Sequence, residues 1–251
     1  MALKINYNII AQFSSIPLFL LLWQWVSDAE IVNPLLFPPP TRVAEAFYRW
    51  ATDGPLIMDV AMSVSRVVVG FTLGSVVGIF VGMLTGRYQL VASLLTPIFG
   101  ILRPIPPIAF VPLVILWFGL SEVGKYFLVF WGVFFTVWIA THLGVQRVDQ
   151  TYIRAARCLG TPEHRMLSEV LFPGSLPFIF VGLRTSVSIA FYTLVAAELA
   201  GAFSGVVYRI DIAQQNLQIG QVMAGLLILG FMSAITDKLF SVITQRIGWW
   251  E

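Results

Sequence analysis

The sequence predicts an all-α membrane protein with six transmembrane helices, and two observations carry this prediction. The chain of 251 residues is 58% hydrophobic and only 11% charged, whereas a soluble domain carries about 25% charged residues. Its apolar residues also fall into runs long enough to cross a hydrocarbon core of about 30 Å. A water-soluble fold could not bury this much apolar surface, so we expect the bilayer to solvate much of it. The expected spans are 9–26, 60–85, 89–118, 125–145, 176–200 and 219–247.

The spans divide the chain into three segments. Residues 1–27 hold a peripheral first span, which we expect to be retained because no small-residue cleavage site follows its apolar run. Residues 28–59 form an outer, periplasmic segment, in which the Pro38–Pro40 run imposes an extended path and residues 42–51 suit a short amphipathic helix. Residues 60–251 form the core domain with the other five spans.

The distribution of Lys and Arg residues predicts the orientation of the chain. Six spans leave both termini on one side of the membrane. With the termini in the cytoplasm, eight basic residues lie at inner edges and four at outer edges, which agrees with the positive-inside rule. The inner set is Lys4, Arg87, Arg147, Arg154, Arg157, Arg165, Lys238 and Arg246, and the outer set is Arg42, Arg49, Lys125 and Arg209. Three further arginines, Arg66, Arg103 and Arg184, remain inside spans.

Glycines recur every four residues along the second span. They lie on one helical stripe, where their small size lets another backbone approach closely. Packing inside the subunit is the simpler interpretation, and contact with a second copy of the chain is the alternative. The five glycines are Gly70, Gly74, Gly78, Gly82 and Gly86.

The third span is expected to break near the middle of the membrane. Arg103, Pro104, Pro106 and Pro107 fall together there, and freed backbone groups at that depth are tolerated only inside protein or beside a wet cavity. These four residues are therefore candidates for a translocation pathway. An arginine at the membrane centre costs roughly 2.5–3.5 kcal/mol, so Arg103 needs either an ion pair, with Glu198 as the candidate partner, or a wet path for an anion.

The segment between the fourth and fifth spans is charged and compatible with helix. Its sequence, IRAARCLGTPEHRMLSEVLFPGSLP, predicts a helix that stops at Gly160. Thr161 could cap a second short helix with Pro162 at its first position. Pro173 and Pro177 would then mark the return to the membrane.

The same segment resembles the "EAA" loop of permease subunits in binding-protein-dependent ABC importers. That pattern reads E-A-A, three residues, G, about nine residues, then I-x-L-P, and Arg154 here takes the place of the Glu. In that family the loop forms a short cytoplasmic helix that docks on the ATPase subunit. The resemblance implies a coupling helix at about 151–173, with Arg154, Ala155, Ala156, Gly160, Thr161, Pro162 and Arg165 as coupling residues.

Residues 103–122 and 181–202 are similar to the corresponding stretches of nitrate, sulfonate and taurine permeases, the taurine type most closely. The resemblance implies the MetI-like bundle of type I importers in a bacterial inner membrane. It also implies two ABC ATPase subunits, a periplasmic or lipid-anchored binding protein and a second copy of the chain. The expected substrate is a small anion, a sulfonate such as taurine, with nitrate, bicarbonate or another small solute as alternatives. Arg184 and Glu198 join the residues at 103–107 as pathway candidates.

No feature of the sequence indicates an enzyme, a metal site or a cofactor. Residues 119–125 match G-x-x-x-x-G-K, but Tyr126 stands where a nucleotide site needs Ser or Thr. His142 and His164 lack partners at metal-binding spacing, and a net charge of +2 is too small to indicate nucleic acid. A secondary transporter driven by an ion gradient is the rival interpretation. It could use Arg103, Arg184 and Glu198 for coupling, but the internal repeats that it favours are not seen.

Overall fold

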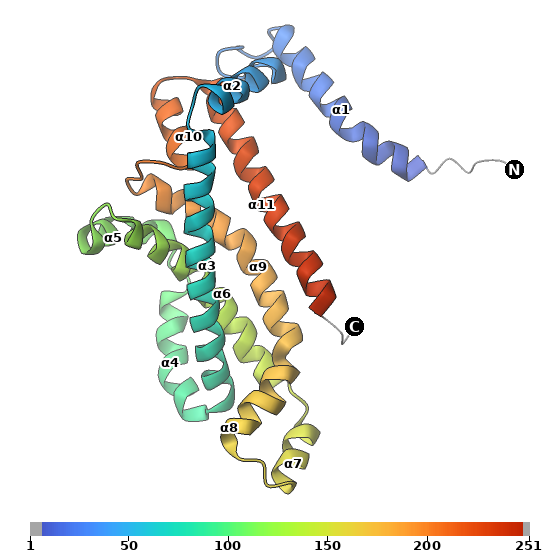
Figure 1. The fold of residues 1–251 in the computed structure, drawn as a ribbon, viewed down its shortest axis with the longest axis vertical. Helices are drawn as coiled ribbons and strands as arrows, with labels where there is room; N and C mark the ends of the chain where they lie inside the picture. Colours follow the sequence, from blue (N-terminus) through green and yellow to red (C-terminus); the bar gives the residue numbers. More distant parts are fainter. Residues whose placement is uncertain (1–6, 248–251) are drawn as a thin grey trace, which may run out of the picture.

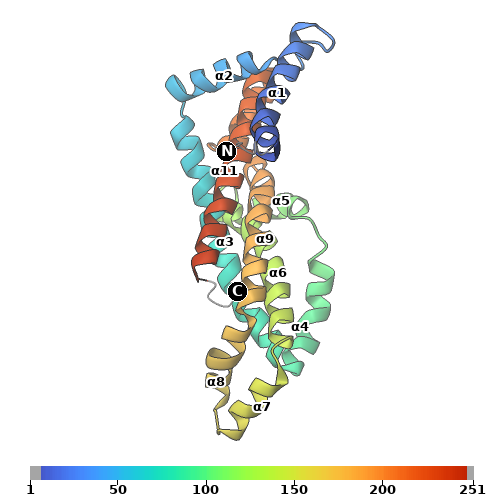
Figure 2. The ribbon, with the colours of Figure 1, turned by 90° about the vertical axis from the view of Figure 1, so that its right-hand side faces the viewer.

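The structure, a computed structural model, describes residues 7–247, with side chains described for residues 14–244. This part of the chain is an elongated bundle, and its long helices run roughly along the long axis (Figures 1 and 2). The helices are α1 Tyr7–Asp28, α2 Pro40–Thr52, α3 Leu56–Arg87, α4 Gln89–Leu102, η1 Pro107–Phe110, α5 Val111–Phe118, α6 Glu122–Gln146, α7 Gln150–Cys158, α8 Glu163–Arg165, η2 Met166–Leu171, α9 Phe172–Leu199, α10 Val206–Gln215 and α11 Ile219–Ile247.

Within the described residues, four helices are long and apolar enough to cross a membrane: Leu56–Arg87, Glu122–Gln146, Glu163–Leu199 and Ile219–Thr244. A fifth span is obtained if α4 and the helical stretch Pro107–Phe118, bent by 86° at the residues between them, are counted together. These helices confirm the predicted all-α membrane architecture. The first predicted span falls on α1, a helix of 22 residues whose first seven side chains lie outside the described set.

The glycine stripe of α3 faces α6. A Cβ atom added at Gly70 would lie 2.5 Å from the Cβ of Val129, and one added at Gly82 would lie 2.5 Å from the Cβ of Thr141. The two helices therefore approach at a distance that only glycine permits. Packing inside the subunit was the simpler of the two interpretations of this stripe, and the structure supports it.

Enlarging a glycine of this stripe should destabilise the bundle. Gly82→Leu places its side chain against Thr141 and the carbonyl oxygen of Trp138, and overpacking of this kind costs about 1–3 kcal/mol. Gly230→Leu on α11 is the matched control, because no heavy atom lies within 4 Å of a Cβ added there. We expect a lower thermal unfolding midpoint in detergent for Gly82→Leu alone. Equal midpoints for the two variants would contradict the packing described here.

The core is centred on α6, which lies between α3 and α9. Leu128, Val129 and Val133 of α6 pack with Ala190 and Leu194 of α9. By contrast, only 17% of the apolar window of α11 is buried, against 61% for α6. Figure 1 shows α1 projecting from the bundle beside α2. The outer surfaces of α1 and α11 are therefore left for lipid or for another chain.

The helix predicted at 42–51 is present as α2, which extends from Pro40 to Thr52. It begins at Pro40 because proline is accommodated in the first helical turn, where no hydrogen-bond donor is needed. Val43 and Trp50 are buried, and the indole of Trp50 donates a hydrogen bond to Asp59 at 3.1 Å. This bond holds α2 against the N-terminal end of α3.

Candidate functional site

The loop between α6 and α9 forms one tip of the molecule, where α7 and α8 project beyond the long helices (Figure 1). The first helix, α7, is capped by Asp149, whose carboxylate accepts the backbone N–H of Thr151 at 2.8 Å. This hydrogen bond holds the pKa of the Asp149 carboxyl below its usual range. The cap places the start of α7 directly after α6.

The turn after α7 requires glycine. Gly160 has a φ of +73°, a conformation that L side chains rarely adopt. Its N–H donates to the carbonyl of Arg157, and the N–H of Thr161 donates to the carbonyl of Ala156, both at 3.0 Å. These two bonds form a Schellman motif. The helix stop predicted at Gly160 is therefore present.

Two details of this loop differ from the prediction. Thr161 does not cap the second helix, because Pro162 occupies the N-cap position with extended backbone and α8 begins at Glu163. The second short helix is also not separate from the following span, since helix continues from Glu163 through Pro173 and Pro177 to Leu199. A π-helical stretch, η2, comes just before Pro173, and its wider turn accommodates a residue that has no N–H to donate.

Apolar packing and an ion pair hold the loop against the bundle. Ile153 and Ala156 of α7 are buried in a cluster with Met166 and Leu171 of η2. Glu163 pairs with Arg87 at the end of α3, with an N–O distance of 2.6 Å. The predicted coupling residues differ in exposure. Ala156 is buried in this cluster, whereas the exposed ones are Arg154, Ala155, Gly160, Pro162 and Arg165. The loop thus presents a supported surface that the described part of the chain leaves uncovered.

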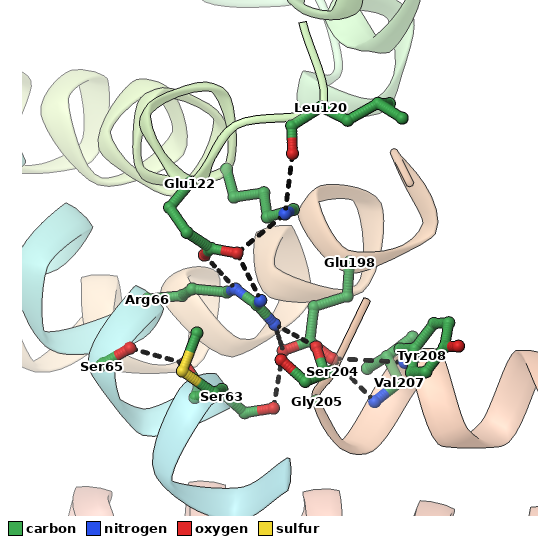
Figure 3. A network of polar contacts seen from close by, with 12 residues as sticks. Ser63, Ser65, Arg66, Leu120, Glu122, Glu198, Ser204, Gly205, Val207 and Tyr208 are labelled. Carbon is green, nitrogen blue, oxygen red and sulfur yellow. Dashed lines mark hydrogen bonds and ion pairs between the residues drawn. The ribbon is translucent and has the colours of Figure 1, made fainter. Parts of the chain in front are cut away.

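A network of charged residues joins the first half of α3 to the start of α6 and the end of α9 (Figure 3). Arg66 of α3 is fully buried, and its guanidinium donates to both carboxylate oxygens of Glu122, at 2.7 and 2.8 Å. It also donates to Glu198 at 2.9 Å and to the carbonyl of Ser204 at 2.6 Å. Lys125 pairs with Glu122 at 2.8 Å. Two cations and two carboxylates therefore balance one another, which is the condition under which buried charges are tolerated.

Glu198 connects three helices in this network. One carboxylate oxygen accepts from Ser63 at 2.6 Å and from Arg66. The other accepts the N–H groups of Val207 and Tyr208, at 2.9 and 3.3 Å, at the start of α10. Glu198 thus holds together α3, the end of α9 and the beginning of α10.

Of the two alternatives considered for Arg103, an ion pair with Glu198 and a wet path for an anion, the ion pair is not formed in this structure. Both oxygens of Glu198 are occupied in the network, whereas the side chain of Arg103 is exposed and has no hydrogen bond or ion pair with the described residues. Lys125, expected at an outer edge, is buried. The G-x-x-x-x-G-K stretch holds no nucleotide motif but supplies Glu122 and Lys125 to the network. The signal available in the sequence was Arg66 itself, an arginine inside a predicted span that needs carboxylate partners.

The broken span lines a cavity of about 450 Å³. Arg103, Pro104, Pro106 and Pro107 form one side, so the structure brings these four candidates together. The other side comes from α6 and α9. It consists of Trp131, Gly132, Phe135, Thr136, Ile139, Ile189, Tyr192 and Thr193.

The other two pathway candidates do not line this cavity. Glu198 belongs to the charge network, and Arg184 lies on a different face of α9, where it contacts Asp237 of α11 at 3.5 Å. The predicted pathway residues therefore occupy three separate places.

The bundle, its broken span and the projecting helical loop define the membrane subunit of a transporter that depends on other proteins. Residues 74–248 match the family described as "Binding-protein-dependent transport system inner membrane component", and the chain belongs to this family. The resemblance noted in the sequence is thereby confirmed. Members of this family are transport components, so the chain is an ABC importer permease rather than an enzyme or an ion-driven secondary transporter.

Individual relatives cover nearly the whole chain. A Bacillus subtilis (strain 168) protein named as aliphatic sulfonates transport permease protein SsuC is 35% identical, over 92% of this chain and 83% of that one. The taurine transport system permease protein TauC of Escherichia coli (strain K12) is 30% identical, over 98% and 92%. A crystal structure of an amino acid ABC transporter with histidines superposes with a TM-score of 0.60 at 16% identity, covering 82% of this chain and 96% of that one. This last likeness shows the fold alone.

Proposed function

We propose that this permease moves a small sulfonate, with taurine among the candidates, into the cytoplasm, and that two separate ATPase subunits hydrolyse the ATP. The observation that carries the proposal is the loop from α7 to α8. It is braced by buried apolar contacts and by the Arg87–Glu163 pair, yet its outer side is uncovered: Tyr152 is 67% exposed and Leu159 is 85% exposed. An apolar and basic surface held so firmly suits a protein partner.

The sulfonate class is supported by relatives named for aliphatic sulfonates and taurine. A relative of 29% identity from Synechocystis sp. (strain ATCC 27184 / PCC 6803 / Kazusa) is named as a nitrate import permease protein, so nitrate is the second candidate. Bicarbonate is a third small anion of similar charge.

We further propose that two copies of the chain enclose the path. The broken span leaves large apolar residues uncovered, among them Ile101 at 73% and Leu116 at 78% exposure. Irregular backbone cannot face lipid, so a second copy is the partner that suits this side. A substrate-binding protein would approach the end that carries the charge network and α2.

The proposed orientation places the α7–α8 tip in the cytoplasm and α2 outside. Figure 1 shows that α1 ends and α11 begins near α2. In chain order α1 therefore leads toward that end and α11 leads away from it, which agrees with the proposal that both termini lie in the cytoplasm. The membrane is the bacterial inner membrane.

Cys158 provides the test of docking and orientation together, because it is the single cysteine of the chain and is exposed on α7. An impermeant maleimide should label it in inverted vesicles stripped of peripheral proteins but not in sealed cells. Adding back the ATPase that co-purifies with the tagged permease should slow labelling and restore ATP-dependent uptake of sulfonate, since docking covers the loop.

The control places the cysteine at the other end of the molecule. In a Cys158→Ser background, Thr52→Cys on the exposed end of α2 should label in sealed cells and should be indifferent to the ATPase. Labelling of Cys158 from outside would reverse the proposed orientation. A permease that imports sulfonate without any ATPase would overturn the proposed function.

A further inference from the structure

We propose that the cavity beside the broken span is a binding site for an alkyl sulfonate, in which Arg103 holds the charged head and the apolar lining receives the tail. The inference rests on the proposed function and deepens it, because it locates a substrate site within the permease itself. It also favours sulfonates with an apolar tail over nitrate and over a zwitterion.

The position of the cavity shows why it must be wet or covered by protein. The break between α4 and α5 lies about halfway along the bundle (Figure 2). Pro104 and Pro107 have no N–H groups, so the carbonyls of Gly100 and Arg103 lack the donor that a continuous helix would supply four residues later. Such carbonyls cannot face hydrocarbon. The exposed side chain of Arg103 therefore points toward a water-filled path or a partner chain rather than toward lipid.

Two residues that line the cavity carry side-chain donors with no acceptor among the described residues. Arg103 has no acceptor among the described residues, and the indole nitrogen of Trp131 is buried without an acceptor. An unsatisfied buried donor costs free energy unless a ligand or water accepts from it. Phe110 and Phe135 hold the Trp131 ring, with ring centroids 4.5 and 5.0 Å away. A fixed indole N–H and a guanidinium match the three acceptor oxygens of a sulfonate.

The remaining lining residues favour a ligand whose tail is apolar and uncharged. It contains no Asp or Glu, so a ligand ammonium would have no carboxylate to pair with. Thr136 and Thr193 donate their hydroxyls to backbone carbonyls of their own helices. Ile139 and Ile189 are apolar, and the volume of about 450 Å³ lies within the usual size of small-ligand sites. An anion with an aliphatic tail would bury that tail against these apolar residues, whereas nitrate has no tail to contact them.

Close packing keeps the cavity in shape. A Cβ atom at Gly132 would lie 2.5 Å from the methyl carbon of Thr193, so α6 and α9 meet directly at the cavity wall. The site is thus formed by two core helices and the broken span.

The test uses the complete complex of permease, ATPase and binding protein in proteoliposomes. Uptake of methanesulfonate, butanesulfonate, hexanesulfonate and taurine is measured with the binding protein saturated by each, so that differences arise in the permease. We expect Arg103→Gln to lower uptake of every sulfonate by about tenfold or more, as for loss of a hydrogen bond from a charged group. Arg103→Lys should retain part of it, since charge remains but the two-pronged geometry is lost.

Two further variants examine the head and the tail separately. Trp131→Phe removes only the indole N–H and should lower uptake of all sulfonates by several fold. Ile189→Trp fills the cavity and should reduce hexanesulfonate uptake far more than methanesulfonate uptake. Lys238→Gln is the control: Lys238 is an exposed cation of α11 that does not line the cavity, so this variant should match the unmodified complex.

The possible results separate the inference from the function on which it rests. If the unmodified complex imports no sulfonate, the proposed function fails. If it imports sulfonates and Arg103→Gln does so at the same rate, the site alone is overturned. Equal effects of Ile189→Trp on short and long tails would overturn the placement of the tail. Failure of the Arg103 and Trp131 variants to assemble would show that these residues only support the bundle, and would also overturn the site.

Discussion

Arg66→Met is expected to destabilise the permease strongly. The substitution leaves Glu198 as a carboxylate with no exposed side-chain surface and no cation beside it. Breaking a buried ion pair by removing one partner costs about 3–5 kcal/mol. The loss is large compared with the 5–15 kcal/mol by which proteins are typically stable. The measurement is the thermal unfolding midpoint of the detergent-solubilised protein, together with its yield in the membrane.

A double variant tests whether the unpaired charge is the cause. Arg66→Met combined with Glu198→Gln removes both charges of the pair, and we expect it to recover much of the loss. Glu122 keeps Lys125 as its partner in both variants. The matched control is Arg49→Met, which breaks an exposed i,i+4 pair with Glu45 and should cost no more than about 0.5 kcal/mol. If Arg66→Met unfolded at the temperature of the control, the network would have no structural role.

Gly160→Asp is expected to uncouple ATP hydrolysis from transport, while Gly160→Asn should leave them coupled. Asn and Asp are the residues other than glycine that most readily adopt the positive φ found here, so their backbone costs are similar. No heavy atom lies within 4 Å of a Cβ added at Gly160, so neither side chain clashes within the subunit. The difference between the variants is the negative charge, placed near Glu163 on the surface that we propose for docking.

Sulfonate uptake and phosphate release by the reconstituted complex measure this coupling. The expected result for Gly160→Asp is a well-assembled permease whose uptake per ATP is nearly lost. Gly160→Val separates the backbone effect, since a β-branched residue at positive φ strains the turn without adding charge. Full uptake by a well-expressed Gly160→Asp complex would contradict the proposed coupling surface.

Much of the fold could be predicted because it depends on local pattern. Apolar runs of membrane length predicted the positions of the long helices. The three prolines at 104, 106 and 107 predicted the position of the break, because proline lacks a backbone N–H donor in any context. The spacing of the glycines predicted a close helix contact. Gly160 predicted the turn after α7 for the same reason, because left-handed backbone favours glycine in any context.

The membrane path was predicted only in part. Arg103 was recognised as a cation that needs compensation, and the residues around the break do line one cavity. Its suggested partner was wrong, because the choice between Arg66 and Arg103 depends on which face of α9 carries Glu198. A sequence shows the depth of a charge in a span but not the rotation of one helix against another.

By itself, the sequence determined that this chain is helical, membrane-spanning and broken at residues 103–107, since these properties follow from composition and from backbone chemistry within a few residues. Only the tertiary structure decided that Arg66, Glu122 and Glu198 meet, because the residues are separated by 56 and 132 positions along the chain. Their contact depends on how α3, α6 and α9 pack, and that packing is set by the glycine stripe and the valines facing it. It likewise decided that Trp131, whose indole N–H has no acceptor among the described residues, lines the same cavity as Arg103.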